Sequence, residues 1–104
     1  MILYNVTINI DTSVEQSWLT WMKETHIPDV MSTGCFTRNI VCKINAESEG
    51  GTSYSIQYFC NSKKELDQYM DIYATKLQRE HALKFQGKFV AFRTLLDVIH
   101  SHEV

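Results

Sequence analysis

The sequence predicts an α+β domain in which two helices cover one face of a four-stranded antiparallel sheet. Four segments have the alternation or composition of strands, and two segments between them repeat apolar residues at helical spacing, in the order β-α-β-β-α-β. No linker or low-complexity stretch interrupts this order, and 104 residues suit one compact domain. We therefore expect a single domain over residues 1–99 and a frayed C-terminal tail over residues 100–104.

The first strand is predicted at residues 2–10, which alternate strictly. Its buried face carries Ile2, Tyr4, Val6, Ile8 and Ile10. A helix follows, because Thr12 and Ser13 each precede Glu or Gln by three residues, as in a capping box. Its apolar positions recur at Val14, Trp18, Trp21, Met22 and Thr25. Pro28 disfavours helical geometry at the residue before it, so this helix is expected to end or kink near His26.

A hairpin is predicted next, with strands at residues 35–46 and 52–60 and a polar, glycine-containing connection at residues 47–51. One face of the second strand carries Phe36, Arg38, Ile40, Cys42 and Ile44. One face of the third strand carries Tyr54, Ile56, Tyr58 and Cys60, and the opposite face is polar. We expect the face of Phe36 and the face of Tyr54 to meet the helices.

The second helix is expected to begin at a capping box formed by Ser62 and Glu65 and to end before Gly87. Its apolar stripe is Leu66, Tyr69, Met70, Tyr73, Leu77 and His81. Gln78 falls outside the stripe and is expected in solvent. The last strand, at residues 88–99, is apolar on both faces, with only Arg93 and Asp97 interrupting.

Two βαβ units joined by a hairpin form a ferredoxin-like split βαβ sandwich, in which the first and third strands are central. The last strand is then a long apolar edge, although natural edges are normally protected by charge, proline or brevity. A second copy of the chain is the simplest cover for such an edge. We therefore expect a homodimer.

Composition excludes several classes of partner. The net charge is −2 without a basic block, which argues against nucleic acid. No apolar stretch approaches the roughly 18 residues that would span a bilayer, and the first residues read as a strand rather than a signal peptide. The three cysteines have no CxxC spacing, and the histidines have no metal-binding spacing. We expect reduced thiols, a cytoplasmic protein, and neither metal nor cofactor.

A family resemblance adds to this pattern. The spacing Trp21-x4-His26-x-Pro28-x5-Gly34-x-Phe36 is similar to a pattern at the end of the first helix in several families of the dimeric α/β-barrel superfamily. In that superfamily two ferredoxin-like subunits bring their sheets together face to face. The chain more closely resembles a small bacterial family of unknown function, found largely in Bacteroidetes. It shares with that family the opening Tyr4-Asn5-Val6-Thr7 and the ending Phe89-Val90-Ala91-Phe92-Arg93-Thr94-Leu95-Leu96. The resemblance implies a dimeric α/β barrel and brings no known reaction with it.

The superfamily includes cofactor-independent monooxygenases, haem-degrading monooxygenases and isomerases of small cyclic acids. Haem-degrading members bind iron through a histidine near the end of the second helix, with an asparagine on the first strand and a tryptophan on the second helix. Here the resemblance offers Asn5 and, about half a turn past the expected position, His81. Tyr69 stands where the tryptophan would be. These two departures make haem binding the third of our hypotheses.

Two histidines are candidates for a site. His26, beside the Pro28 break, is a candidate catalytic general base that Glu24 or Asp29 would orient, or else it caps the carbonyl groups of a helix C-terminus. His81 continues the apolar stripe and is either a core residue or a ligand contact.

Aromatic residues and one arginine complete the candidate ligand-binding set. Trp21, with Trp18, either lines a pocket or fills the core. Four phenols, Tyr54, Tyr58, Tyr69 and Tyr73, converge if the third strand meets the helices, and buried hydroxyls need partners. Arg38 requires a carboxylate from the protein or from an acidic ligand, unless its side chain extends to water.

The function predicted first is a homodimer that binds a small organic ligand or acts as an interaction module. The alternative is a cofactor-independent monooxygenase or isomerase that acts on a small cyclic or aromatic acid. Haem binding is third. An enzyme should show a closed cavity where His26, Arg38 or the tyrosines converge, whereas an interaction module should fill that space with aromatic side chains.

Overall fold

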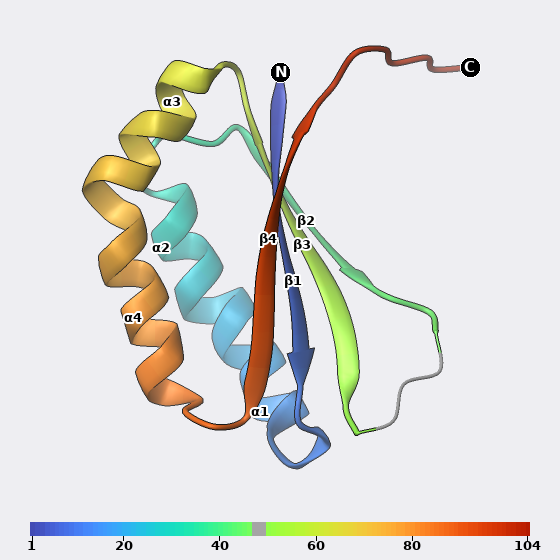
Figure 1. Cartoon of the computed structure of the whole chain (residues 1–104), viewed down its shortest axis with the longest axis vertical. Coiled ribbons are helices and arrows are strands. Elements are labelled where there is room, and N and C mark those ends of the chain that lie inside the picture. Colours follow the sequence, from blue (N-terminus) through green and yellow to red (C-terminus); the bar gives the residue numbers. More distant parts are fainter. Residues whose placement is uncertain (47–49) are drawn as a thin grey trace.

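The computed structural model describes residues 1–46 and 50–104, and its sheet has the strand order β2-β3-β1-β4 (Figure 1). The strands are β1 (Ile2–Ile10), β2 (Arg38–Lys43), β3 (Thr52–Cys60) and β4 (Phe89–Asp97). All pairings are antiparallel, and the first and third strands are central, as the sequence predicts. Of the hairpin connection expected at residues 47–51, residues 47–49 lie outside the described residues.

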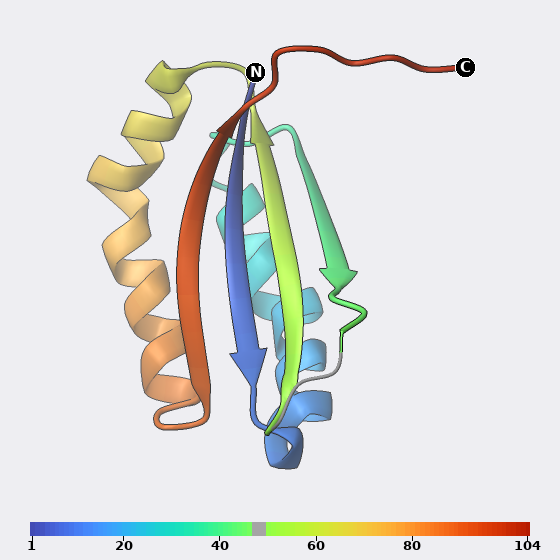
Figure 2. The same cartoon turned by 45° about the vertical axis from the view of Figure 1, so that its right-hand side comes forward.

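The helices cover one face of this sheet in both views (Figures 1 and 2). The central strands direct their apolar residues to that face, with Tyr4 opposite Tyr58 and Val6 opposite Ile56. These side chains are buried, as strict alternation requires. Each contributes about 1.5–3 kcal/mol by leaving water. This α+β, ferredoxin-like architecture confirms the predicted fold class.

The first helical segment is a 3₁₀ turn (Thr12–Val14) followed by α1 (Glu15–Trp21), a π-helical turn (Met22–His26) and α2 (Ile27–Met31). Its N-cap is Asp11, and neither expected capping box forms. The Asp11 carboxylate accepts hydrogen bonds from the backbone N–H and the hydroxyl of Ser13, at 2.8 and 2.7 Å. Asp11 is the N-cap because it directly precedes the first helical residue, and from that position a short acceptor side chain reaches the free backbone N–H groups.

Of the two outcomes expected from Pro28, an end or a kink near His26, the end does not occur: the helix continues, with a π-helical irregularity at this point. The turn before the proline widens, so that the Ile27 N–H donates to the carbonyl of Met22, five residues back. This turn contains one extra residue and shifts every later position by one. His26 is therefore half-buried where regular spacing points to Thr25, which is exposed.

The second helical segment is α3 (Lys63–Gln68), a π-helical turn (Tyr69–Tyr73) and α4 (Ala74–Lys84). The Ser62 hydroxyl donates to the Glu65 carboxylate at its start, so the two predicted residues meet, but the Ser62 side chain caps no backbone N–H and the predicted capping box is not complete. The predicted stripe packs inward: Leu66, Tyr69, Leu77 and His81 are buried, and Met70 and Tyr73 pack against the core.

Strand β2 is shorter than predicted, and its faces are the reverse of the predicted ones. Val41 pairs with Ile56 and packs against the core, whereas Arg38 pairs with Phe59 on the opposite face. Phe36 is buried, but it precedes the strand, in an irregular segment after Gly34. The alternation therefore does not continue from Phe36 to Arg38.

The other face of the sheet carries no helix (Figure 2). Half-buried polar side chains hydrogen-bond one another across its centre: Ser55 to Asn5, Asn5 to Thr7, Gln57 to Ser55, and Asn9 to Ser53. Along β4 the same face exposes apolar side chains, with Val90 at 71% and Phe92 at 61% of their full area. We call this surface the open sheet face. Within the described residues, no helix has the length and apolar character to cross a membrane.

Candidate functional site

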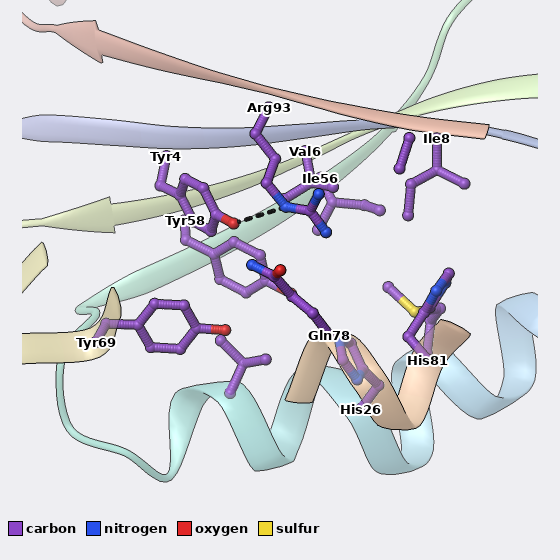
Figure 3. A pocket seen from close by; sticks show the side chains of 13 residues that line it. Tyr4, Val6, Ile8, His26, Ile56, Tyr58, Tyr69, Gln78, His81 and Arg93 are labelled. Atoms are coloured by element: carbon purple, nitrogen blue, oxygen red, sulfur yellow. Dashed lines mark hydrogen bonds between the residues drawn. The ribbon is translucent and has the colours of Figure 1, made fainter. Parts of the chain in front are cut away.

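A small cavity lies between the sheet and the two helical segments (Figure 3). Its polar lining residues are Tyr4, His26, Tyr58, Tyr69, Gln78, His81 and Arg93; its apolar lining residues are Val6, Ile8, Met22, Val30, Ile56 and Ala91. The centre of a water molecule can occupy about 30 Å³ of it, which is room for roughly two waters. We call this space the central cavity.

Arg93 reaches the central cavity from edge strand β4, where it pairs with Val6 of β1. Its Nε–H donates a hydrogen bond to the Tyr4 hydroxyl at 3.0 Å, and the forked end of the guanidinium points into the cavity (Figure 3). Burial raises the pKa of Tyr4, although Arg93 and the adjacent Gln78 amide act in the opposite direction. Tyr4 is therefore a neutral phenol at physiological pH, held in place by a cation.

Two more phenols line the cavity, Tyr58 from β3 and Tyr69 from the second helical segment. Burial raises the pKa of both hydroxyls above the ordinary value for tyrosine. Within the described residues, neither hydroxyl has a hydrogen-bond partner in the protein. Since buried hydroxyls need partners, these groups are available to water or to a ligand.

His26 presents a buried, unpaired ring nitrogen. Its Nδ1 has no hydrogen-bond partner. One face of the ring is covered by Trp21, which stacks at 5.0 Å between centroids and 26° between planes. Burial lowers the pKa of His26 to about 4, against the opposing effect of Asp29. Within the described residues, neither Asp29 nor Glu24 hydrogen-bonds the ring, so the expected orienting contact is missing. His26 is a neutral imidazole at physiological pH.

His81 lies 5.6 Å from His26 between ring centroids and is held by Trp18. The Trp18 indole N–H donates to Nε2 of His81 at 2.9 Å. Burial, His26 and Arg93 lower the pKa of His81 to about 4. The second imidazole of the cavity is therefore also neutral, with one nitrogen already in use.

Four predicted site residues do not line the central cavity. Arg38 is exposed on the open sheet face, 5.5 Å above the Phe59 ring. Tyr54 donates its hydroxyl proton to Glu15 at 2.5 Å, and Tyr73 lines an outer groove beside Asp29. Trp21 backs His26 without reaching the cavity. The four phenols expected to converge therefore do not all meet. Three phenols line the cavity instead: Tyr58, Tyr69 and Tyr4, which was not predicted.

The haem-like arrangement suggested by the resemblance does not form. Asn5 lies on the open sheet face, hydrogen-bonded to Thr7 and Ser55, whereas His81 lies on the helical side of the sheet. Nε2 of His81 accepts the Trp18 hydrogen bond. Within the described residues, no three His, Cys, Asp or Glu side chains come close enough to hold a metal ion.

Sequence reasoning missed Tyr4, Gln78 and Arg93 as site residues. Tyr4 stands on the buried face of β1, which is usually plain core. Gln78 was expected in solvent, yet it turns inward because the π-helical turn displaces the positions that follow it. Arg93 carried a usable signal, since a lone cation within an apolar strand needs a partner.

The chain also resembles solved structures. A dimeric ferredoxin-like protein from an uncultured marine organism matches at 14% identity, with a TM-score of 0.72, over 99% of this chain and 98% of that one. An ethyl tert-butyl ether D (EthD) family protein from Bacillus halodurans matches at 17% identity, with a TM-score of 0.66, over 95% of this chain and 100% of that one. A Deinococcus radiodurans protein classed by its name with the antibiotic biosynthesis monooxygenases matches at 11% identity, with a TM-score of 0.65, over 100% of this chain and 98% of that one. At these identities the likeness shows the fold alone.

No curated protein matches the chain. A family model does match, and it covers residues 1–99. That span includes every element of the sheet and every residue of the central cavity. The chain therefore belongs to the family described as domain of unknown function DUF4286.

Proposed function

We propose that this protein is a homodimer that binds a small organic ligand in the central cavity of each subunit. The observation that supports a ligand is the unpaired, buried Nδ1 of His26, whose ring lines a cavity together with two phenols that have no partner in the protein. A protein core normally satisfies such groups. Aromatic side chains fill much of this layer, since Tyr4 packs against Tyr58 and Tyr69 at 6.1 and 6.0 Å between ring centroids, but they leave the small cavity and its unpaired groups.

A fragment screen tests the ligand. Matched pairs of small compounds, acetate with acetamide and benzoate with benzamide, are added to the protein at pH 7, and the ring protons of His26 are followed by NMR. Binding in the cavity shifts these signals and leaves those of His100 and His102 in the tail unchanged. If no compound of either kind moves the His26 signals, ligand binding at this cavity is refuted and the reading as an interaction module is favoured.

The dimer rests on the open sheet face. This face combines a half-buried polar centre with the exposed apolar side chains of β4, a mixture that suits a partly wet interface between two subunits. A protein of the same fold that is described as dimeric supports a dimer. Two-fold closure covers the same patch on both chains and prevents open-ended edge pairing. We expect an interface on the order of 2,000 Å² or more.

Light scattering at micromolar concentration tests the dimer. The wild-type protein is expected at about twice the chain mass of 12.1 kDa. Phe92→Asp places a charge on the open sheet face and is expected to give monomer or unfolded chain. Leu83→Asp is the matched control, because Leu83 is 64% exposed on α4, away from the sheet. A monodisperse wild-type monomer would overturn the dimer.

A catalytic role is the second candidate, favoured by the pairing of a neutral imidazole with a cation across one cavity. Nδ1 of His26 can accept a proton from a carbon acid while the electron pair moves to an oxygen facing Arg93. This step is common to isomerases and cofactor-independent monooxygenases that act on small cyclic acids. Loss of deuterium from the α-carbon of a deuterated cyclic monoketone, followed by NMR, tests it: His26→Gln should abolish any enhancement and His100→Gln should not. No enhancement with wild-type protein counts against this candidate.

A further inference from the structure

Arg93 is a cation without an anion. Within the described residues, the only salt bridge joins Lys63 and Asp67 on α3, so no carboxylate lies within ion-pair distance of the Arg93 guanidinium. No Asp or Glu lines the central cavity. A guanidinium carries five N–H donors, and only the Nε–H is used, by Tyr4. The two terminal amino groups of Arg93 are left facing the cavity (Figure 3).

The remaining polar groups of the cavity carry no compensating negative charge. Tyr4, Tyr58 and Tyr69 are protonated phenols, since burial raises their pKa values. Gln78 is a neutral amide that extends from α4 toward Arg93 (Figure 3). The lining of the cavity therefore carries one positive charge, on Arg93, and its other polar side chains are neutral.

Arg38, the other arginine of the sheet, lies on the face opposite the central cavity. Arg38 is exposed on the open sheet face and lies above the Phe59 ring, where water solvates its charge. Arg93 is exposed as well, but it turns its forked end back under the sheet, toward two phenols and a histidine that line the cavity. A planar guanidinium with two free amino groups matches a carboxylate or an enolate oxygen.

We infer that the ligand of the central cavity is a small organic anion whose charged oxygens are held by the terminal amino groups of Arg93. This inference rests on the ligand-binding function proposed above and specifies its chemistry. The uncharged part of the ligand extends inward, past Tyr58 and Tyr69 toward Nδ1 of His26. Because the space holds roughly two waters, an organic ring enters only if lining side chains move, and we expect the Arg93 side chain to move outward. Arg93 can move, since it belongs to an edge strand and is itself exposed.

The acid and amide pairs separate charge from shape. At pH 7, acetate and benzoate are expected to shift the His26 ring signals with at least tenfold lower dissociation constants than acetamide and benzamide. Arg93→Gln removes the charge and keeps a polar side chain. It is expected to weaken the binding of acetate and benzoate at least tenfold. Arg93→Lys keeps the positive charge but not the forked guanidinium. Its dissociation constants for the acids are expected to lie between those of wild type and Arg93→Gln. Arg38→Gln, the matched control on the opposite face, is expected to stay within twofold of wild type.

The outcomes are distinct. The inference that the ligand is an anion is refuted if amides bind as tightly as acids, or if Arg93→Gln binds acids as tightly as wild type does. Either result leaves the proposed ligand-binding cavity in place. If neither acids nor amides bind, the proposed ligand-binding function is refuted, and so is the inference that the ligand is an anion. The comparison of acids with amides needs only wild-type protein, so it tests whether the ligand is an anion even if Arg93→Gln does not fold.

Discussion

The indole N–H of Trp18 donates a hydrogen bond to Nε2 of His81 across 2.9 Å, in the buried layer between the helices and the sheet. A neutral imidazole that accepts at Nε2 carries its proton on Nδ1. A residue of the first helical segment thus sets the tautomer of a cavity histidine in the second, and it occupies the Nε2 atom of that histidine.

Replacing Trp18 tests this contact. Trp18→Phe removes the donor, leaves a buried nitrogen unpaired and creates a small void, so we expect a loss of about 2–4 kcal/mol in the free energy of unfolding. Denaturant titration measures it, and the ¹⁵N shifts of His81 should show a mixture of tautomers. Trp21→Phe is the control: Trp21 is half-buried and donates no hydrogen bond among the described residues, so its loss should be smaller. Equal losses would contradict the structural role assigned to the Trp18–His81 bond.

Stability should fall between pH 7.5 and pH 5. Folding lowers the pKa of His26 and of His81 to about 4, below the ordinary value of 6.5. The unfolded chain then binds more protons than the folded chain, so this stabilisation is fully present above pH 6.5 and is lost as the pH falls toward 4. At pH 5 the loss is about 2 kcal/mol for each imidazole.

Urea titrations at pH 7.5, 6 and 5 check this dependence. His26→Gln should flatten the slope, whereas the double variant His100→Gln/His102→Gln in the exposed tail should keep it. A wild-type stability that does not change over this range would show that neither imidazole is buried in the neutral form.

The Tyr54–Glu15 hydrogen bond should stabilise the junction between β3 and α1. Tyr54 donates to the Glu15 carboxylate at 2.5 Å, and this contact is the largest cause that lowers the pKa of Glu15. The Glu15 carboxylate in turn helps raise the pKa of Tyr54 to about 12, where burial is the larger cause. We expect Tyr54→Phe to cost about 1–2 kcal/mol and to raise the pKa of Glu15 measured by NMR. Tyr73→Phe is the control, since Tyr73 makes no hydrogen bond within the described residues. An unchanged Glu15 pKa in Tyr54→Phe would refute the contact.

Gly51 should be the least replaceable glycine. Its φ is +122°, and a Cβ there would lie 2.6 Å from the carbonyl oxygen of Ile10 and 2.7 Å from Oδ1 of Asn9. Gly51→Ala is expected to cost about 3 kcal/mol or more, through backbone strain and the collision with β1. At Gly87, where φ is +74° and the space is open, alanine is expected to cost about 1–2 kcal/mol. Thermal unfolding compares the two, and a larger loss at Gly87 would contradict the assigned packing.

Residues with one clear periodicity were predicted well. The inward faces of β1 and β3 follow from strict alternation, and burial agrees from Tyr4 to Cys60. Predictions failed where a local rule met an irregular backbone. Regular spacing could not show that π-helical turns would bring His26 and Gln78 inward. It also could not show that the chain after Phe36 would break its alternation and leave Arg38 outside.

The sequence by itself determined the order of the elements, the strand order of the sheet and the apolar stripe that ends at His81, because these follow from periodicity and short-range capping. Only the tertiary structure decided which arginine belongs to the cavity. Strand β4 is apolar on both faces, so its pattern is equally compatible with either orientation, and the choice depends on pairing with β1. That pairing places Arg93 opposite Val6, on the side of the sheet that faces the helices, and so brings a cation to two histidines that are distant in sequence.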